Sequence, residues 1–253
     1  MRILAFDTSS RDVQIALIES GKAVLCRNLA PPAASRQESA SMLLPEIDSA
    51  LKELSWAKAD IDLIVVGVGP GSFTGVRVSV VAARSIGQAL NLGVLPVSTL
   101  EAQAFLSPRP CVVALSAGNN MLFGAAYDNS LATAETNPLI EPFYGSPLDL
   151  LSRVAQLGKN KAESLHWHLD SKFPAQIWQE AASAAPSSEW LPKPTNQPAE
   201  SESSQNLASA AGILACARIA ANTSRSELAN RYNWANVLPL YLQSPSVTLQ
   251  NKS

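Results

Sequence analysis

Several residue types that carry chemistry are scarce in this chain of 253 residues. The three cysteines, Cys26, Cys111 and Cys216, lie far apart and form no Cys-x-x-Cys pair, which argues against both a zinc site and a disulfide framework. Only two histidines are present, His166 and His168, and a metal site built on them would need a third ligand from elsewhere. We therefore predict no metal site and no cofactor.

Charge and long apolar runs are also in short supply. Charged residues make up 16% of the chain and the formal net charge is −2, so no strongly basic field exists to hold nucleic acid without help. No run of 18 apolar residues occurs, and the apolar stretch after Met1 is too short for a signal peptide. We therefore expect a cytoplasmic protein with no membrane contact, whose 47% hydrophobic residues are ample for a core.

The most informative motif is Gly69-Pro-Gly-Ser-Phe-Thr-Gly75. An apolar run over 60–68 precedes it and a helical pattern over 76–90 follows it, which is the order strand, glycine loop, helix. Such a loop directs backbone N–H groups toward one point, and the helix N-terminus adds partial positive charge. It is not a Walker A loop, because Gly75 is followed by Val76 rather than by Lys and Ser or Thr.

Two interpretations of this loop are open at the level of sequence. In the first, the loop binds an anion or a ligand of a partner. The candidate residues for that role are Asp7, Gly69, Gly71, Ser72, Thr74 and Gly75. In the second, which we favour, the loop is a tight structural turn in which glycine supplies a positive φ and Ser72 or Thr74 caps the helix.

The predicted elements form two similar groups. Strand patterns cover 2–6, 13–19 and 22–28, Ser20-Gly21 is a hairpin turn, and helical spacing covers 36–54 and 76–90. A strand–turn–strand order begins again near residue 111. This layout predicts an α/β protein with the ASKHA fold of actin, Hsp70 and sugar kinases, built from two related lobes. We expect lobes over 1–106 and 107–236, a mobile segment over 186–206, and a tail over 237–253 that returns to the first lobe.

Five stretches, in the same order, resemble the bacterial TsaB (YeaZ) family. They are Ile3-Leu-Ala-Phe-Asp-Thr-Ser9, Leu43-Leu-Pro45, Gly69 to Ser79, Pro96-Val-Ser-Thr-Leu100 and Pro239-Leu-Tyr-Leu242. The resemblance is strong over 1–105, sparse over 106–206, and returns at the C-terminus. It departs from the family at Ser116-Ala-Gly118, where many relatives have Asp-Ala-Arg, and at Gln243, where an arginine is usual.

The resemblance implies a role in the synthesis of threonylcarbamoyladenosine on tRNA, without catalysis by this chain itself. It implies pairing with TsaD, a metal-binding homologue that transfers the threonylcarbamoyl group, and with TsaE, a small ATPase. TsaC would supply the threonylcarbamoyl-adenylate. The tRNA would be contacted only through the complex, and the isolated chain could form a homodimer.

The residues themselves also argue against catalysis. An ASKHA ATPase uses an aspartate in each lobe to hold magnesium and orient water. Asp7 could serve in the first lobe, but the corresponding turn of the second lobe begins with Ser116. We therefore predict no catalytic residue. The alternatives are a small ASKHA ATPase or phosphotransferase and a degenerate metallopeptidase-like protein.

The helical pattern over 76–90 carries more apolar positions than one buried face needs, and the pattern over 36–54 adds Met42, a residue type that adapts well to interfaces. Such helices are either core helices covered on two sides or helices that pack on a partner. Together with the family resemblance, this favours a partner surface. The predicted interface residues are Met42, Leu43, Arg77, Val80, Ala83, Arg84 and Gly87.

Overall fold

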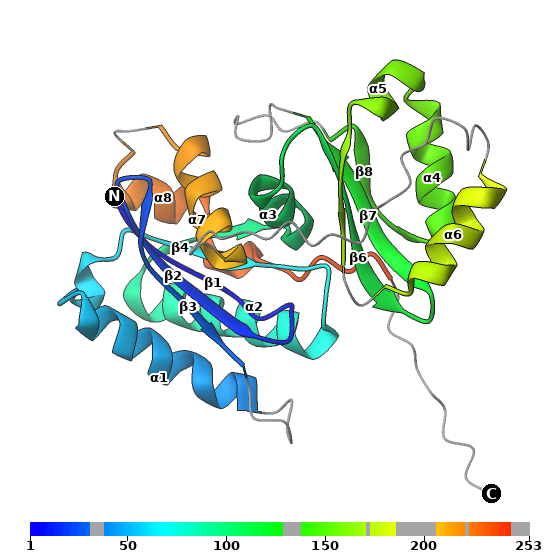
Figure 1. Ribbon diagram of the computed structural model, residues 1–253. Coiled ribbons are helices and arrows are strands. Elements are labelled where there is room, and N and C mark those ends of the chain that lie inside the picture. The colour runs from blue at the N-terminus through cyan, green and yellow to red at the C-terminus, as the bar shows by residue number, and fades with distance from the viewer. Residues whose placement is uncertain (31–37, 129–137, 171–172, 186–205, 221–222, 244–253) are drawn as a thin grey trace, which may run out of the picture.

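The structure, a computed structural model, describes residues 1–30, 38–128, 138–170, 173–185, 206–220 and 223–243 (Figure 1). The strands are β1 (Arg2–Asp7), β2 (Val13–Glu19), β3 (Lys22–Leu29), β4 (Leu63–Gly67), β5 (Gly93–Val97), β6 (Cys111–Gly118), β7 (Met121–Tyr127), β8 (Ile140–Gly145) and β9 (His166–Leu169). The α-helices are α1 (Glu38–Glu53), α2 (Phe73–Leu90), α3 (Thr99–Leu106), α4 (Pro147–Gln156), α5 (Lys159–Glu163), α6 (Ala175–Ala184), α7 (Leu207–Arg218) and α8 (Arg225–Arg231). The predicted mobile segment lies outside the described residues except for Asn206, as does the tail beyond 243.

The strands form two sheets, one in each half of the molecule. The first has the order β3-β2-β1-β4-β5 and the second has the order β8-β7-β6-β9. In the first sheet, β1 pairs antiparallel with β2 and parallel with β4. The predicted hairpin between β2 and β3 is confirmed, with positive φ values of 51° at Ser20 and 79° at Gly21, as a tight hairpin turn requires.

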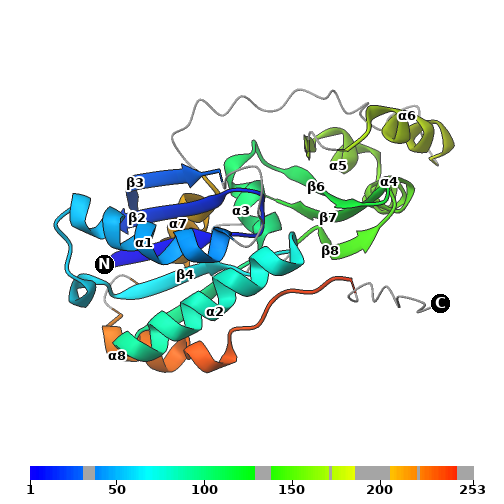
Figure 2. The ribbon, with the colours of Figure 1, turned by 90° about the horizontal axis from the view of Figure 1, so that it is seen from below.

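The first sheet is covered on both faces. Alternate residues of a strand point to opposite faces, so Leu4 and Phe6 pack with α1 and α2, while Ile3 and Ala5 pack with α7. Figure 2 shows α1 and α2 side by side on the first of these faces. Both strands and helices therefore bury apolar side chains, and burial of such side chains is the main stabilising term.

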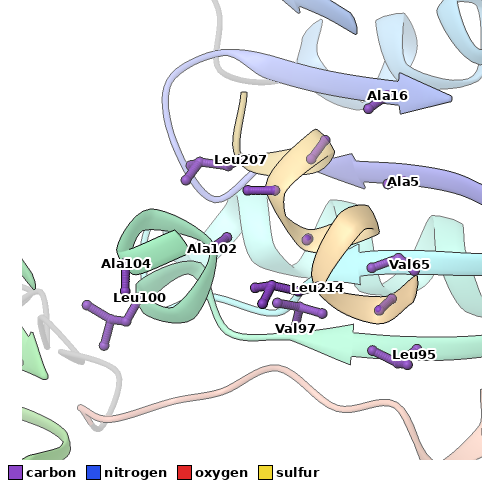
Figure 3. Close-up of a cluster of buried hydrophobic side chains, with 14 of the residues drawn as sticks. Ala5, Ala16, Val65, Leu95, Val97, Leu100, Ala102, Ala104, Leu207 and Leu214 are labelled. Atoms are coloured by element: carbon purple, nitrogen blue, oxygen red, sulfur yellow. The ribbon is translucent and has the colours of Figure 1, made fainter. Parts of the chain in front are cut away.

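Helix α3 joins the two halves. Its residues Leu100 and Ala104 belong to the same buried cluster as Val97 of β5 (Figure 3). Cys111 of β6 is also a member of that cluster. On the far side of the second sheet, α4 and α6 cover a separate apolar cluster that includes Leu150 and Trp178. The layers therefore run helix, sheet, helix, sheet, helix across the molecule (Figure 1).

Helix α7 packs on the first sheet, although the predicted division places residues 207–218 in the second lobe. Small residues allow the close approach: a Cβ at Gly212 would lie 2.6 Å from Cγ1 of Ile18. The start of α7 is fixed by the buried Asn206, whose amide donates to the carbonyl oxygen of Arg27 at 3.0 Å. The first half of the molecule therefore consists of segments from both ends of the chain.

Residues 237–243, here called the C-terminal strap, run along α2 without regular secondary structure (Figure 2). Val237 is buried, and the backbone N–H of Leu240 donates to the carbonyl oxygen of Val68 at 2.8 Å. The strap thus lies beside the start of the glycine loop. Within the described residues, none of the helices has the length and apolarity needed to cross a bilayer.

Candidate functional site

Asp7 lies at the end of β1 and is almost fully buried, with 1% of its surface exposed. Its Oδ1 accepts the backbone N–H of Ser9 at 2.6 Å, and its Oδ2 accepts the hydroxyl of Thr99 at 3.3 Å. A Cβ at Gly67 would overlap with this carboxyl group, so glycine is required there. Burial raises the pKa of Asp7, and the hydrogen bonds from Ser9 and Thr99 oppose that rise.

The glycine loop packs directly against the residues that follow Asp7. The backbone N–H of Ser72 donates to the carbonyl oxygen of Ser9 at 2.7 Å, and the Thr8 hydroxyl donates to the carbonyl oxygen of Gly75 at 2.6 Å. A Cβ at Gly71 would lie 2.5 Å from the Ser9 carbonyl oxygen, and one at Gly75 would overlap with the Thr8 carbonyl oxygen. The inner side of the loop is thus filled by this chain's own backbone.

Gly69 and Ser72 of the loop have structural roles as well. Gly69 has a φ of 89°, in the left-handed region that favours glycine. Ser72 caps α2, because its hydroxyl accepts the backbone N–H of Gly75. Thr74 is exposed, and the helix begins at Phe73 rather than at the predicted Val76. The structure therefore brings Asp7, Gly71 and Gly75 together through the Thr8–Ser9 backbone, in the arrangement that the turn interpretation requires.

The second half contains a carboxylate that the sequence interpretation missed. Asp170 follows β9, and its Oδ2 accepts the backbone N–H of Ser116 at 3.2 Å. Strand β9 pairs in parallel with β6, which brings Asp170 beside the turn that lacks an aspartate of its own. Only a long-range strand pairing places the two residues together, so no local sequence signal could have found this contact.

The two histidines lie two positions apart on strand β9, so their side chains leave the same face of the strand. His166 is exposed, and Nδ1 of the partly buried His168 lies 3.4 Å from the side-chain amide of Gln103. Burial lowers the pKa of His168, an effect that the nearby Asp170 opposes. Within the described ranges, no group of three His, Cys, Asp or Glu side chains is placed to hold a metal ion.

A comparison of the sequence with models of protein families identifies one family. The family model described as TsaD, tRNA N6-adenosine threonylcarbamoyltransferase, matches residues 29–242. The chain belongs to this family. The match covers β4 and β5 of the first sheet, the whole second sheet, the glycine loop and most of the C-terminal strap, and it begins at the last residue of β3.

Within the TsaD family, the chain is similar to curated proteins named tRNA threonylcarbamoyladenosine biosynthesis protein TsaB. It is 34% identical over 104 residues to that of Haemophilus influenzae, covering 41% of this chain and 42% of the relative. The same identity over 104 residues holds for that of Escherichia coli, of which 43% is covered. The chain thus spans less than half the length of these two relatives. The predicted resemblance to TsaB (YeaZ) is confirmed.

A solved structure supports the fold over nearly the whole chain. It is titled YeaZ from Pseudomonas aeruginosa and aligns with a TM-score of 0.61, at 24% identity, covering 95% of this chain and 99% of that one. The predicted ASKHA fold, of class α/β, is therefore confirmed.

The structure corrects four of the predicted interface positions in this TsaD-family chain. Leu43, Val80, Ala83 and Gly87 are buried in the core between the first sheet and helices α1 and α2. A Cβ at Gly87 would lie 2.6 Å from Cγ2 of Val94, so its small size serves packing with β5. These residues face inward because they lie three or four positions apart on one side of their helices.

The other three predicted interface residues are accessible. Met42 and Arg84 are partly buried, and Arg77 is exposed. The Arg77 guanidinium carbon lies 4.2 Å from the centre of the Phe73 ring, and its Nε donates to the Tyr241 hydroxyl oxygen at 3.1 Å. Phe73 and Tyr241 stack with ring centres 5.1 Å apart. Arg77 is therefore held by aromatic side chains of α2 and of the C-terminal strap.

Proposed function

We propose that this chain is a non-catalytic partner subunit in the synthesis of threonylcarbamoyladenosine on tRNA. It pairs with a TsaD-like metal-binding subunit that performs the transfer, and a TsaE-like ATPase joins the pair. The chain contacts tRNA only through the complex, acts in the cytoplasm, and needs no cofactor of its own. Membership of the TsaD family and the names of the matched relatives support the pathway.

One observation carries the non-catalytic part of the proposal: the carboxyl group of Asp7 is buried and internally hydrogen-bonded. A catalytic aspartate of an ASKHA ATPase must reach magnesium or a water molecule at the phosphates. Around Asp7 this space is occupied by Ser9 and Thr99, which bond to each other, and by the glycine loop that packs on Thr8. The residue therefore stabilises a junction between β1, the glycine loop and α3.

We assign the pairing surface to the outer side of α2 and the adjoining α1. Met42, Arg77 and Arg84 remain from the predicted set, and Leu44 and Val81 are added because they are 53% and 62% exposed. Large apolar side chains at such exposure are the ones that a partner would cover. The four buried positions support this surface from beneath.

A reconstituted reaction tests the proposal. It would combine this chain with the TsaD-like, TsaE-like and TsaC-like proteins of the same organism, tRNA, threonine, bicarbonate and ATP. Mass spectrometry of the digested tRNA should detect threonylcarbamoyladenosine only when this chain is present. The chain alone should hydrolyse no more ATP than its Asp7→Asn variant. Magnesium-dependent hydrolysis that disappears in Asp7→Asn would favour the alternative of a small ATPase or phosphotransferase.

A further inference from the structure

Exposed apolar side chains gather where α2 meets the C-terminal strap. Phe73 and Val81 of α2 are 38% and 62% exposed, and Leu238 and Tyr241 of the strap are 66% and 43% exposed. Together with Arg77, we call these residues the α2–strap surface. Phe73, Arg77 and Val81 follow one another at four-residue spacing and so share one side of the helix. Figure 2 shows the strap running along this helix.

Arg77 is oriented but not neutralised. Its guanidinium lies over the Phe73 ring, and its Nε is bound to the Tyr241 hydroxyl. Its two Nη groups have no hydrogen bond or ion pair with any residue that the structure describes. A planar guanidinium fixed in this way presents two parallel N–H donors, which match a carboxylate in a bidentate pair. The entropy cost of orienting this side chain has thus been met within the fold.

The charges around this arginine favour an acidic partner. Neither α2 nor the strap contains an aspartate or glutamate. Three acidic residues of the adjoining α1 are paired within the chain: Arg27 lies 2.8 Å from Glu46 and 2.5 Å from Glu53, and Lys52 lies 2.7 Å from Asp48. As far as the described side chains go, the surface is therefore apolar and its positive charge is uncompensated. Its complement is an apolar surface that carries a carboxylate.

We propose that the α2–strap surface binds the TsaD-like subunit through an apolar segment of that subunit whose carboxylate pairs with the two Nη groups of Arg77. This inference rests on the proposed function and adds the C-terminal strap to the pairing surface. In the complex, the apolar segment of the partner, together with Val81 and Leu238 of the same surface, shields the ion pair from water. Such shielding by apolar neighbours is typical of the residues that dominate binding energy at interfaces.

The test measures the dissociation constant between this chain and the purified TsaD-like protein of the same organism by isothermal titration calorimetry. Arg77→Ala should weaken binding by roughly 30-fold or more, and Leu238→Ser by about 10-fold, as expected for interface hot spots. Arg77→Lys, which keeps the charge but loses the two parallel N–H donors of the guanidinium, should weaken binding by about 5- to 10-fold. Leu148→Ser is the matched control, because Leu148 is 38% exposed on α4, and it should change binding less than about twofold.

Binding by the wild-type chain and binding by the variants test the proposed function and the present inference separately. If the wild-type chain does not bind the TsaD-like protein, both are overturned. If it binds and neither Arg77→Ala nor Leu238→Ser weakens binding, only the present inference is overturned. Because Leu238 is 66% exposed, the Leu238→Ser variant should melt like the wild type, and weaker binding by this variant cannot be attributed to misfolding.

Two further outcomes would assign the surface to another occupant. Sedimentation velocity detects self-association: a dimer that Arg77→Ala dissociates, without binding of the TsaD-like protein, would identify a second copy of this chain. Arg77-dependent binding of tRNA by the chain alone would identify RNA. Each result would overturn the assignment of the surface to the TsaD-like subunit.

Discussion

The two sides of helix α2 differ strongly in burial, although both carry apolar residues. The inner side, with Val80, Ala83 and Gly87, is buried against the first sheet and η3 (Trp234–Asn236). The outer side, with Arg77 and Val81, is exposed beside the C-terminal strap. Both sides carry apolar residues, so composition does not distinguish them. The inner side therefore fixes the fold, while the outer side is available for recognition.

The strongest test of this comparison places one carboxylate on each side of α2. Ala83→Glu should lower the free energy of unfolding by about 4 kcal/mol or more, because it buries an unpaired charge in a close-packed core. Val81→Glu should change it by no more than about 0.5 kcal/mol, because position 81 is 62% exposed. Urea denaturation followed by circular dichroism measures both. Equal effects of the two variants would mean that the two sides of the helix are not distinguished by burial.

A second test concerns the first turn of the same helix. Gly75→Ala should lower the free energy of unfolding by about 2–4 kcal/mol, because the new Cβ would overlap with the Thr8 carbonyl oxygen. The neighbouring Thr74→Ala is the control, since Thr74 is exposed and should be nearly neutral. Both are measured by chemical denaturation. A neutral Gly75→Ala variant would show that the loop is not packed on Thr8.

Features that depend on local sequence patterns could be predicted, whereas contacts between residues distant in the chain could not. The hairpin of β2 and β3 follows from a local pattern, as does the cap of α2, for which the sequence offers Ser72 and Thr74 and the structure has Ser72. The orientation of α2 could not be predicted, because its apolar residues surround more of the helix than one face. The contact of Asp170 with Ser116 and the position of α7 depend on residues distant in the chain, which local periodicity does not report.

The candidate site shows the same division. The sequence identified the glycines of the loop and offered two explanations for them. The packing that favours the structural explanation, of the Thr8–Ser9 backbone against Gly71 and Gly75, connects segments more than 60 residues apart. A glycine required for close packing and one required for ligand access look identical in a single sequence. Only the neighbouring atoms distinguish them.

A smaller effect is expected from the buried carboxyl group. Because burial raises the pKa of Asp7 in the folded state, ionisation destabilises the fold as pH rises from the unfolded value near 3.8 through the folded value. The asparagine side chain of the Asp7→Asn variant cannot ionise, so the stability of this variant relative to wild type should increase over that window and then level off. Thermal unfolding from about pH 3.5 to pH 7 measures this difference. A difference that falls with rising pH would mean that the ionised form is the stabilised one.

The smallest effect concerns RNA. With a formal net charge of −2, the chain alone should produce no tRNA mobility shift near physiological salt, in contrast to the assembled complex. Tight, salt-sensitive binding by the isolated chain would reveal a basic surface assembled from distant residues. That result would contradict the assignment of tRNA contacts to the complex.

The non-catalytic role is best tested by the rate of threonylcarbamoyladenosine formation in the reconstituted reaction with Asp7→Asn in place of the wild-type chain. We expect that omitting the chain abolishes product and that Asp7→Asn restores it to within about twofold of wild type, because the side chain retains its shape and its place at the junction. Loss of product with a folded Asp7→Asn variant that still binds the TsaD-like subunit would contradict this role, since it would make Asp7 a participant in the chemistry.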